Sequence, residues 1–176
     1  FQTKIIAQTG WTTSNLKSAI TSQNPPNDYD LVTLLIGVNN QYQNTPFNVY
    51  EQEFPELVST AIEKAKGKKE NVIVVSIPDY AFTPFGGGNT SISTQIDDYN
   101  AFAENYCNTN NITFINITDI TRLGLAQTNL VATDGLHPSK IAYTKFVERI
   151  LPKAKIKLGL LVNFGEDSLK YKRVIL

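Results

Sequence analysis

Apolar segments of strand length alternate along this chain with longer segments of helical periodicity. The predicted strands are 3–8, 31–36, 71–77 and 112–117. The second and third are nearly continuous in leucine, isoleucine and valine, which is typical of strands covered on both faces of a parallel sheet. The predicted helices are 13–23, 46–66, 92–109 and 139–154. This alternation predicts right-handed crossovers and a three-layer α/β/α sandwich.

The loops that follow the strands are the places to look for chemistry, because open parallel sheets bind ligands at the carboxyl ends of their strands. These loops are 8–11, 37–40, 78–89 and 118–137. The third contains three consecutive glycines, 86–88, but no Lys-Ser/Thr follows them, which favours a flexible surface loop over a phosphate site. Its aromatic residues either line an acyl pocket or simply pack the loop.

The C-terminal tail has a pattern of its own. Residues 156–164 have a strand pattern, 165–168 carry a turn signal, and 169–176 are again strand-like and basic. Taken alone, this pattern predicts a β-hairpin. We therefore divide the chain into a domain over 1–155 and a strand or hairpin extension over 156–176.

The composition of the chain disfavours several classes of function. The 176 residues fit one domain, and 16 Lys and Arg balance 16 Asp and Glu, which disfavours a nucleic-acid partner. No apolar run reaches the ~18 residues of a transmembrane helix. Cys107 is the only cysteine, so there is no disulfide framework and no cysteine-based zinc site. We expect that the protein needs neither a metal nor a cofactor. The sequence does not decide whether the protein is cytoplasmic, secreted or periplasmic.

One short run carries the strongest chemical signal. The only histidine, His137, lies three residues after Asp134 in the sequence Asp-Gly-Leu-His-Pro. In a hydrolase triad, a carboxylate orients a histidine base and stabilises its charged form. Asp134 and His137 are therefore the candidate orienter and base. The other interpretation of the run is a capped helix start, and we expect Ser139 to cap the last helix.

Two further loops match one known family together with this run. Gln8-Thr9-Gly10-Trp11-Thr12-Thr13 precedes the first helix, and Gly37-Val38-Asn39-Asn40 follows the second strand. In isolation, the second of these is more often a plain turn. With the Asp-Gly-Leu-His-Pro run, the chain resembles the SGNH (GDSL-type) serine hydrolases over roughly residues 2–153. The resemblance implies a flavodoxin-like sandwich and esterase or lipase activity.

That resemblance also implies roles for particular residues. Asp134 and His137 correspond to the family's triad members, whereas the Gly10 backbone N–H and the Asn39 side chain correspond to its oxyanion donors. Glycine lets a backbone N–H approach the substrate closely, and an amide side chain is a neutral, fixed donor. Family members usually carry aspartate after that asparagine. Here Asn40 stands there, which we expect to change hydrogen bonding within the loop and not the oxyanion donor.

The chain differs from the family at the position of the nucleophile. In the family, a Gly-Asp-Ser motif lies at the end of a first strand, and this strand has no counterpart before Phe1. The chain also contains no methionine. We therefore expect that an upstream segment was cleaved, omitted or lost. In the family this strand is central, between the strands here at 3–8 and 31–36. The tail could fill the slot by circular permutation, with Leu160–Phe164 as the strand and Ser168 as the nucleophile. Against this, the tail resembles the closing hairpin of GxxExxY-family proteins.

Two functions follow from these observations. The first is hydrolysis of a small-molecule ester, such as an acyl ester, a lipid or an acetylated sugar, by a serine-hydrolase mechanism that the missing motif would impair in this chain. The second is a non-catalytic remnant or binding module that keeps the sandwich and the oxyanion pocket without a nucleophile. A flavodoxin-like nucleotide binder is disfavoured, because no phosphate-cradling loop follows the first strand.

Overall fold

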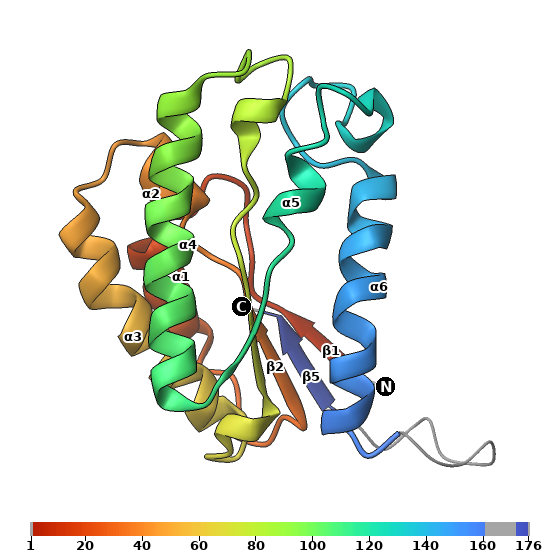
Figure 1. Ribbon diagram of the computed structural model, residues 1–176. Helices are drawn as coiled ribbons and strands as arrows, with labels where there is room; N and C mark the ends of the chain where they lie inside the picture. The colour runs from red at the N-terminus through yellow and green to blue at the C-terminus, as the bar shows by residue number, and fades with distance from the viewer. Residues whose placement is uncertain (1, 161–171, 176) are drawn as a thin grey trace.

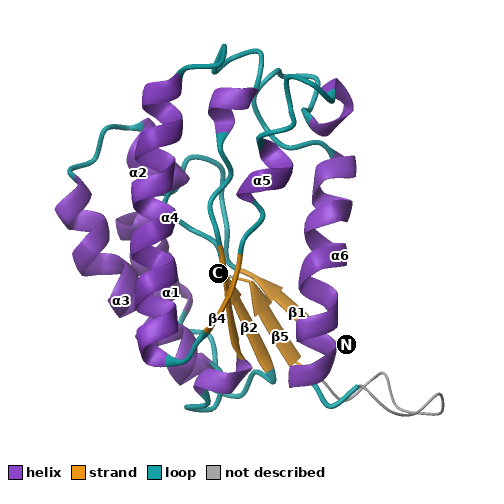
Figure 2. Cartoon of the chain, in the orientation of Figure 1, coloured by secondary structure: helices purple, strands orange, loops and turns teal. Residues whose placement is uncertain are grey.

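A single parallel sheet forms the centre of the molecule (Figure 1, Figure 2). The computed structural model describes residues 2–160 and 172–175. The strands are β1 (Gln2–Ile5), β2 (Leu31–Leu34), β3 (Val72–Val75), β4 (Thr113–Ile115) and β5 (Lys172–Ile175). Their order across the sheet is β1-β5-β2-β3-β4, and every neighbouring pair is parallel. The predicted α/β class with a parallel sheet is thus confirmed.

Helices lie on both sides of the sheet (Figure 1). They are α1 (Thr13–Gln23), α2 (Val38–Tyr42), α3 (Phe47–Lys64), α4 (Thr90–Asn110), α5 (Thr118–Thr121) and α6 (Lys140–Lys157). Three short 3-10 turns are Lys69–Asn71, Tyr80–Phe82 and Thr128–Leu130. Helices α1, α3 and α4 cover one face, and α6 lies on the other. No helix in the described part of the chain is long and apolar enough to cross a bilayer.

Strand alternation divides the interior into two cores. Val32 and Val74 point to the side of α1, α3 and α4, where they join a cluster that includes Phe54 and Ile96. Leu31, Ile73, Val75 and Ile115 point to the other side and pack against Ala142 and Phe146 of α6. Because both faces of β2 and β3 are covered, these strands read as continuous apolar runs in the sequence.

Part of the C-terminal tail enters the sheet between β1 and β2, in the slot that the sequence suggested for it. The strand in the slot is Lys172–Ile175, which pairs in parallel with β1 on one side and with β2 on the other. It is not the segment Leu160–Phe164, most of which lies outside the described residues together with Ser168. Because β5 lies between β1 and β2, backbone hydrogen bonds connect β1 to the rest of the sheet.

Two predictions about local structure were wrong. The strand predicted to begin at 156 does not begin there, because α6 continues to Lys157 and buries Ala154 and Leu158 in the second core. Tertiary packing outweighs the local strand pattern here. The loop expected after the second strand contains a helix, because α2 starts directly after Gly37.

Candidate active site

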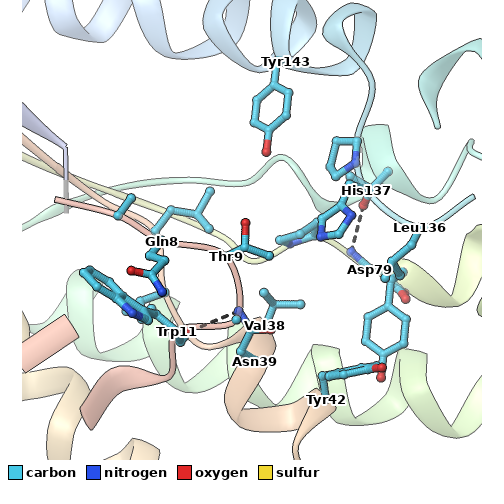
Figure 3. A pocket seen from close by; sticks show the side chains of 18 of the residues that line it. Gln8, Thr9, Trp11, Val38, Asn39, Tyr42, Asp79, Leu136, His137 and Tyr143 are labelled. Atoms are coloured by element: carbon cyan, nitrogen blue, oxygen red, sulfur yellow. Dashed lines mark hydrogen bonds between the residues drawn. The ribbon is translucent and has the colours of Figure 1, made fainter. Parts of the chain in front are cut away.

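A cleft of about 780 Å³ opens at the carboxyl ends of β1, β5, β2 and β3 (Figure 3). The loops that follow these strands supply most of its lining. Gly10, Asn39 and His137, from three separate sequence motifs, all line it. Topology explains the convergence, since strands that run in parallel end at the same edge of the sheet.

The Asp134–His137 run forms one hydrogen-bonded loop. His137 Nδ1 lies 2.7 Å from Asp134 Oδ2, while Asp134 Oδ1 accepts from the backbone N–H groups of Leu136 (2.9 Å) and His137 (3.0 Å). Ser139 accepts from the N–H groups of Ile141 and Ala142, which confirms it as the cap of α6. Because the contact with Asp134 is made through Nδ1, Nε2 is the ring nitrogen that does not contact this carboxylate.

Electrostatics keeps Asp134 ionised. The backbone N–H of His137 is the main cause that lowers the pKa of this carboxyl to about 2, with further contributions from the Leu136 N–H and the His137 side chain. We expect an NMR titration of the carboxyl carbon to give a pKa near 2 for Asp134, whereas ordinary exposed aspartates titrate near 3.8.

The folded-state pKa of Asp134 lies below its unfolded value, so its ionised form stabilises the fold above pH 3.8, and this contribution is lost as the pH falls toward 2. We expect the melting temperature of an Asp134→Asn variant to depend less on pH than that of the wild type between pH 5 and 2. An Asp98→Asn variant, at an exposed position on α4, serves as the matched control. Equal pH dependence of the wild type and Asp134→Asn would contradict the assignment.

Asn39 is held in the first turn of α2 with its amide facing the cleft. Its Nδ2 donates to the carbonyl oxygen of Trp11 at 3.1 Å (Figure 3). An amide nitrogen carries two hydrogens, and the bond to Trp11 uses one of them. Gly37, at the N-cap of α2, sets this geometry because it has a φ of 127°. A Cβ there would lie 2.7 Å from Cε2 of Tyr50.

Replacing Gly37 by alanine is therefore expected to lower the free energy of unfolding strongly. The positive φ alone costs about 1–3 kcal/mol, and the clash with Tyr50 adds to it. Gly67→Ala is the matched control, because its φ is also positive at 70° but a Cβ at that position would meet no atom within 4 Å. Chemical denaturation measures both. A loss in Gly37→Ala no larger than that in Gly67→Ala would contradict the proposed clash.

Hydrogen bonds connect the Gly10 loop and the start of α1 to α2. Gly10 has a φ of 84°, and its carbonyl oxygen accepts from Gln43 Nε2 at 2.7 Å. Asn40 is fully buried; its Oδ1 accepts from the Thr13 N–H and its Nδ2 donates to Thr13 Oγ1. Asn40 thus takes part in hydrogen bonding within the loop, and the predicted change relative to an aspartate at this position stays a prediction. These contacts fix the backbone around Gly10 relative to Asn39.

Several cleft residues were not predicted from the sequence. Tyr143 points its ring into the cleft from α6, on the side opposite Asn39, and Tyr42 lines another part (Figure 3). Tyr80 also lines the cleft, in agreement with the interpretation in which the aromatic loop lines a pocket. Tyr42 could have been found, because it follows Asn39 by three residues and so lies on the same side of a helix. Tyr143 gives no such signal, because an aromatic residue one turn into a helix is most often a core residue.

Asp79 is a fully buried carboxylate at the cleft floor. Arg122 Nε donates to it at 2.9 Å, and the backbone N–H of Ala81 and the hydroxyl of Ser93 donate to it as well. With these partners Asp79 holds the turn that carries Tyr80. Within 2–160 and 172–175, no group of three or more His, Cys, Asp or Glu residues could hold a metal ion.

The nucleophile is the remaining question. Ser168, the candidate from the sequence, lies outside the described residues. Among the described residues that line the cleft, hydroxyls belong to threonines and tyrosines and none to serine. The described site thus brings together Asp134, His137, Asn39 and Gly10.

Known structures share this fold. A GDSL-like lipase from Bacteroides thetaiotaomicron is 23% identical, with a TM-score of 0.60 over 84% of this chain and 72% of that one. A lipase/acylhydrolase from Enterococcus faecalis is 20% identical, with a TM-score of 0.62 over 89% and 75%. A variant of an acetyl xylan esterase from Geobacillus stearothermophilus is 19% identical, with a TM-score of 0.61 over 82% and 68%. The architecture is thus that of the GDSL-type hydrolases.

Comparison of the sequence with models of protein families identifies the family of this chain. The model of the GDSL-like Lipase/Acylhydrolase family matches residues 2–145, so the chain belongs to this family. No curated protein matches the chain. Membership supports esterase or acylhydrolase function, which is the activity that the family's name describes.

Proposed function

We propose that this chain supplies the base, its orienting carboxylate and the oxyanion hole of a serine ester hydrolase. The observation that carries the proposal is the 2.7 Å pair between His137 Nδ1 and Asp134, in a cleft shared with Asn39 and Gly10. Family membership independently favours ester cleavage. His137 is the base, Asp134 orients it, and Asn39 Nδ2 and the Gly10 N–H are the oxyanion donors.

In the first half-reaction, His137 Nε2 takes the proton of a serine hydroxyl as its oxygen bonds to the ester carbonyl carbon. The carbonyl oxygen becomes an oxyanion that accepts from Asn39 and Gly10. When this intermediate collapses, the bond to the alcohol oxygen breaks and His137 returns the proton to that oxygen. The alcohol leaves and the serine keeps the acyl group.

In the second half-reaction, water replaces the alcohol. His137 removes a proton from water as the water oxygen bonds to the acyl carbon, and the same two donors hold the new oxyanion. Collapse breaks the bond to the serine oxygen, which recovers its proton from His137. The acid is released, and no group is oxidised or reduced.

The substrate class is an ester of a small acid, a lipid or an acetylated sugar. A cleft of about 780 Å³ accommodates a ligand of drug-like size, and its lining is mainly apolar. Aromatic residues from four segments contribute to it, namely Trp11, Tyr42, Tyr80 and Tyr143. Among proteins of the same fold, one is described as an acetyl xylan esterase and another as a lipase/acylhydrolase.

Ser168 is the nucleophile candidate within this chain. Hydrolysis of p-nitrophenyl acetate by the wild type, Ser168→Ala and His137→Ala tests it. Activity that is lost in both variants supports a permuted triad with Ser168. Activity that is lost only in His137→Ala supports the site but assigns the nucleophile elsewhere.

One observation favours the second function, a non-catalytic remnant or binding module. No serine is among the described residues that line the cleft. On that account the cleft binds an ester or acid without turnover. Absence of hydrolysis together with saturable binding of a p-nitrophenyl ester, followed through the fluorescence of Trp11, would favour it over catalysis.

A further inference from the structure

A fully buried contact between two side chains joins α1 to α2 beside the candidate oxyanion donors. Asn40 and Thr13 are both inaccessible to solvent. Asn40 Oδ1 accepts from the Thr13 backbone N–H at 3.0 Å, and Asn40 Nδ2 donates to Thr13 Oγ1 at 2.7 Å. A backbone N–H can only donate, so this contact fixes which end of the Asn40 amide is the oxygen. The Thr13 hydroxyl therefore accepts from Asn40 and keeps its own hydrogen for another partner.

That partner is Glu53 on α3. Thr13 Oγ1 donates to Glu53 Oε2 at 2.5 Å, and the hydroxyl of Ser14 donates to the same oxygen at 2.8 Å. Lys17 Nζ lies 3.5 Å from Glu53 Oε1. An ionised carboxylate only accepts, so the hydrogen bonds run one way, from the Asn40 amide through the Thr13 hydroxyl to Glu53. Hydrogen bonds aligned in this way polarise one another, and the charge at the end of the series strengthens them.

The segments that this contact joins also carry both oxyanion donors. Asn39 precedes Asn40 on α2, and Gly10 precedes Thr13 by three residues. The bond from Asn39 Nδ2 to the Trp11 carbonyl oxygen is only partly buried (Figure 3), and the bond to the Gly10 carbonyl oxygen is exposed. Water competes for exposed hydrogen bonds, so the buried contact between Asn40 and Thr13 constrains the two segments most.

We propose that Glu53 is a positioning residue of the oxyanion hole. It acts through Thr13 and Asn40, and it fixes the two oxyanion donors relative to each other. Its effect on catalysis rests on the proposed function, whereas the direction of the hydrogen bonds rests on the contacts alone. This direction makes positions 40 and 53 interdependent. A carboxylate in place of the Asn40 amide would present an acceptor to Thr13 Oγ1, and the single hydroxyl hydrogen cannot serve two carboxylates.

The first test is a double-mutant cycle on the full chain with Asn40→Asp, Glu53→Gln and the two substitutions together. Asn40→Asp leaves a buried acceptor unsatisfied, which should lower the melting temperature by roughly 4–8 °C. Glu53→Gln alone can turn its amide oxygen to Thr13 and should lose little. In the double variant the hydrogen bonds reverse, from the amide nitrogen at position 53 through Thr13 to the carboxylate at position 40. The melting temperature should therefore largely recover.

Glu56→Gln is the matched control for this recovery. Glu56 lies about one turn further along α3, where its carboxylate pairs with Lys17. Both glutamine substitutions remove one negative charge, but only Glu53 accepts from the Thr13 hydroxyl. Recovery of Asn40→Asp by Glu53→Gln and not by Glu56→Gln identifies the bond to the hydroxyl as the cause. Equal recovery with both, or a wild-type melting temperature for Asn40→Asp, overturns the proposal.

Positioning is tested with Glu53→Ala, because Glu53 lies on a different helix from both donors. At a temperature at which all variants are folded, the ¹⁵N–¹H NMR signals of the Gly10 N–H and the Asn39 side-chain amide should move in this variant. They should stay in place in the conservative variant Glu53→Gln and in Glu56→Ala. A role in stability alone would lower the melting temperature of Glu53→Ala without moving these signals, so unmoved signals overturn the positioning role.

Kinetics gives the consequence for catalysis. Glu53→Ala should lower kcat for p-nitrophenyl acetate at least ~10-fold with KM nearly constant, because oxyanion donors act on charge that develops in the transition state. Glu53→Gln should keep kcat within about threefold of the wild type. Unchanged kcat in folded Glu53→Ala overturns the effect on catalysis. Hydrolysis by the wild type and its dependence on His137 test the proposed function, whereas melting temperatures and NMR signals need no turnover, so the two failures are distinguishable.

Discussion

A His137→Gln variant is expected to hydrolyse p-nitrophenyl acetate at least ~10³-fold more slowly than the wild type. A positioned base contributes about 10²–10⁴-fold, and loss of a triad histidine also prevents protonation of the leaving group. The lower limit corresponds to about 4 kcal/mol of barrier. Because the chain contains a single histidine, no second imidazole takes over the role.

The controls separate chemistry from folding. The side chain of His137 is exposed, so the melting temperature of the His137→Gln variant should differ little from that of the wild type. Asp134→Asn is expected to lower the rate as well, since the amide no longer stabilises a protonated imidazole, whereas Asp98→Asn should leave it unchanged. A His137→Gln rate within threefold of wild type would exclude His137 as the base.

An Asn39→Ala variant is expected to lose about 10²–10³-fold in kcat, equivalent to roughly 2.7–4 kcal/mol of barrier. Its amide stabilises negative charge that develops only in the transition state, so kcat should fall while KM stays nearly constant. Steady-state kinetics with p-nitrophenyl acetate measures both constants. The loss of the bond from Asn39 Nδ2 to the Trp11 carbonyl should lower stability by only about 1 kcal/mol.

Asn48→Ala is the matched control for this variant, because Asn48 is an exposed asparagine on α3 that does not line the cleft. It is expected to keep both kinetic constants. If Asn39→Ala raised KM with kcat unchanged, Asn39 would act in ground-state binding and not as an oxyanion donor.

Much of the fold could be predicted from local patterns. The boundaries of α1 match the predicted 13–23, and buried strands β2 and β3 lie within the two most continuous apolar runs. The convergence of Gly10, Asn39 and His137 at one cleft follows from the parallel order of the strands. Their motifs could be found because short polar loops that follow buried strands stand out in a sequence.

What could not be predicted depends on contacts between distant segments. The limit of α6 at Lys157 depends on packing of Ala154 and Leu158 against the sheet, which no local pattern reveals. The choice of Lys172–Ile175 as the strand between β1 and β2 depends on its pairing with both of them.

The location of the acyl group during turnover tests the central claim most directly. The chain is mixed with p-nitrophenyl acetate, quenched within the first turnovers, digested and analysed by mass spectrometry, in parallel with His137→Gln. The account predicts one acetyl group on a serine, formed in the wild type and absent from the variant. Hydrolysis at the same rate in both proteins, with no acetylated serine in either, would contradict it.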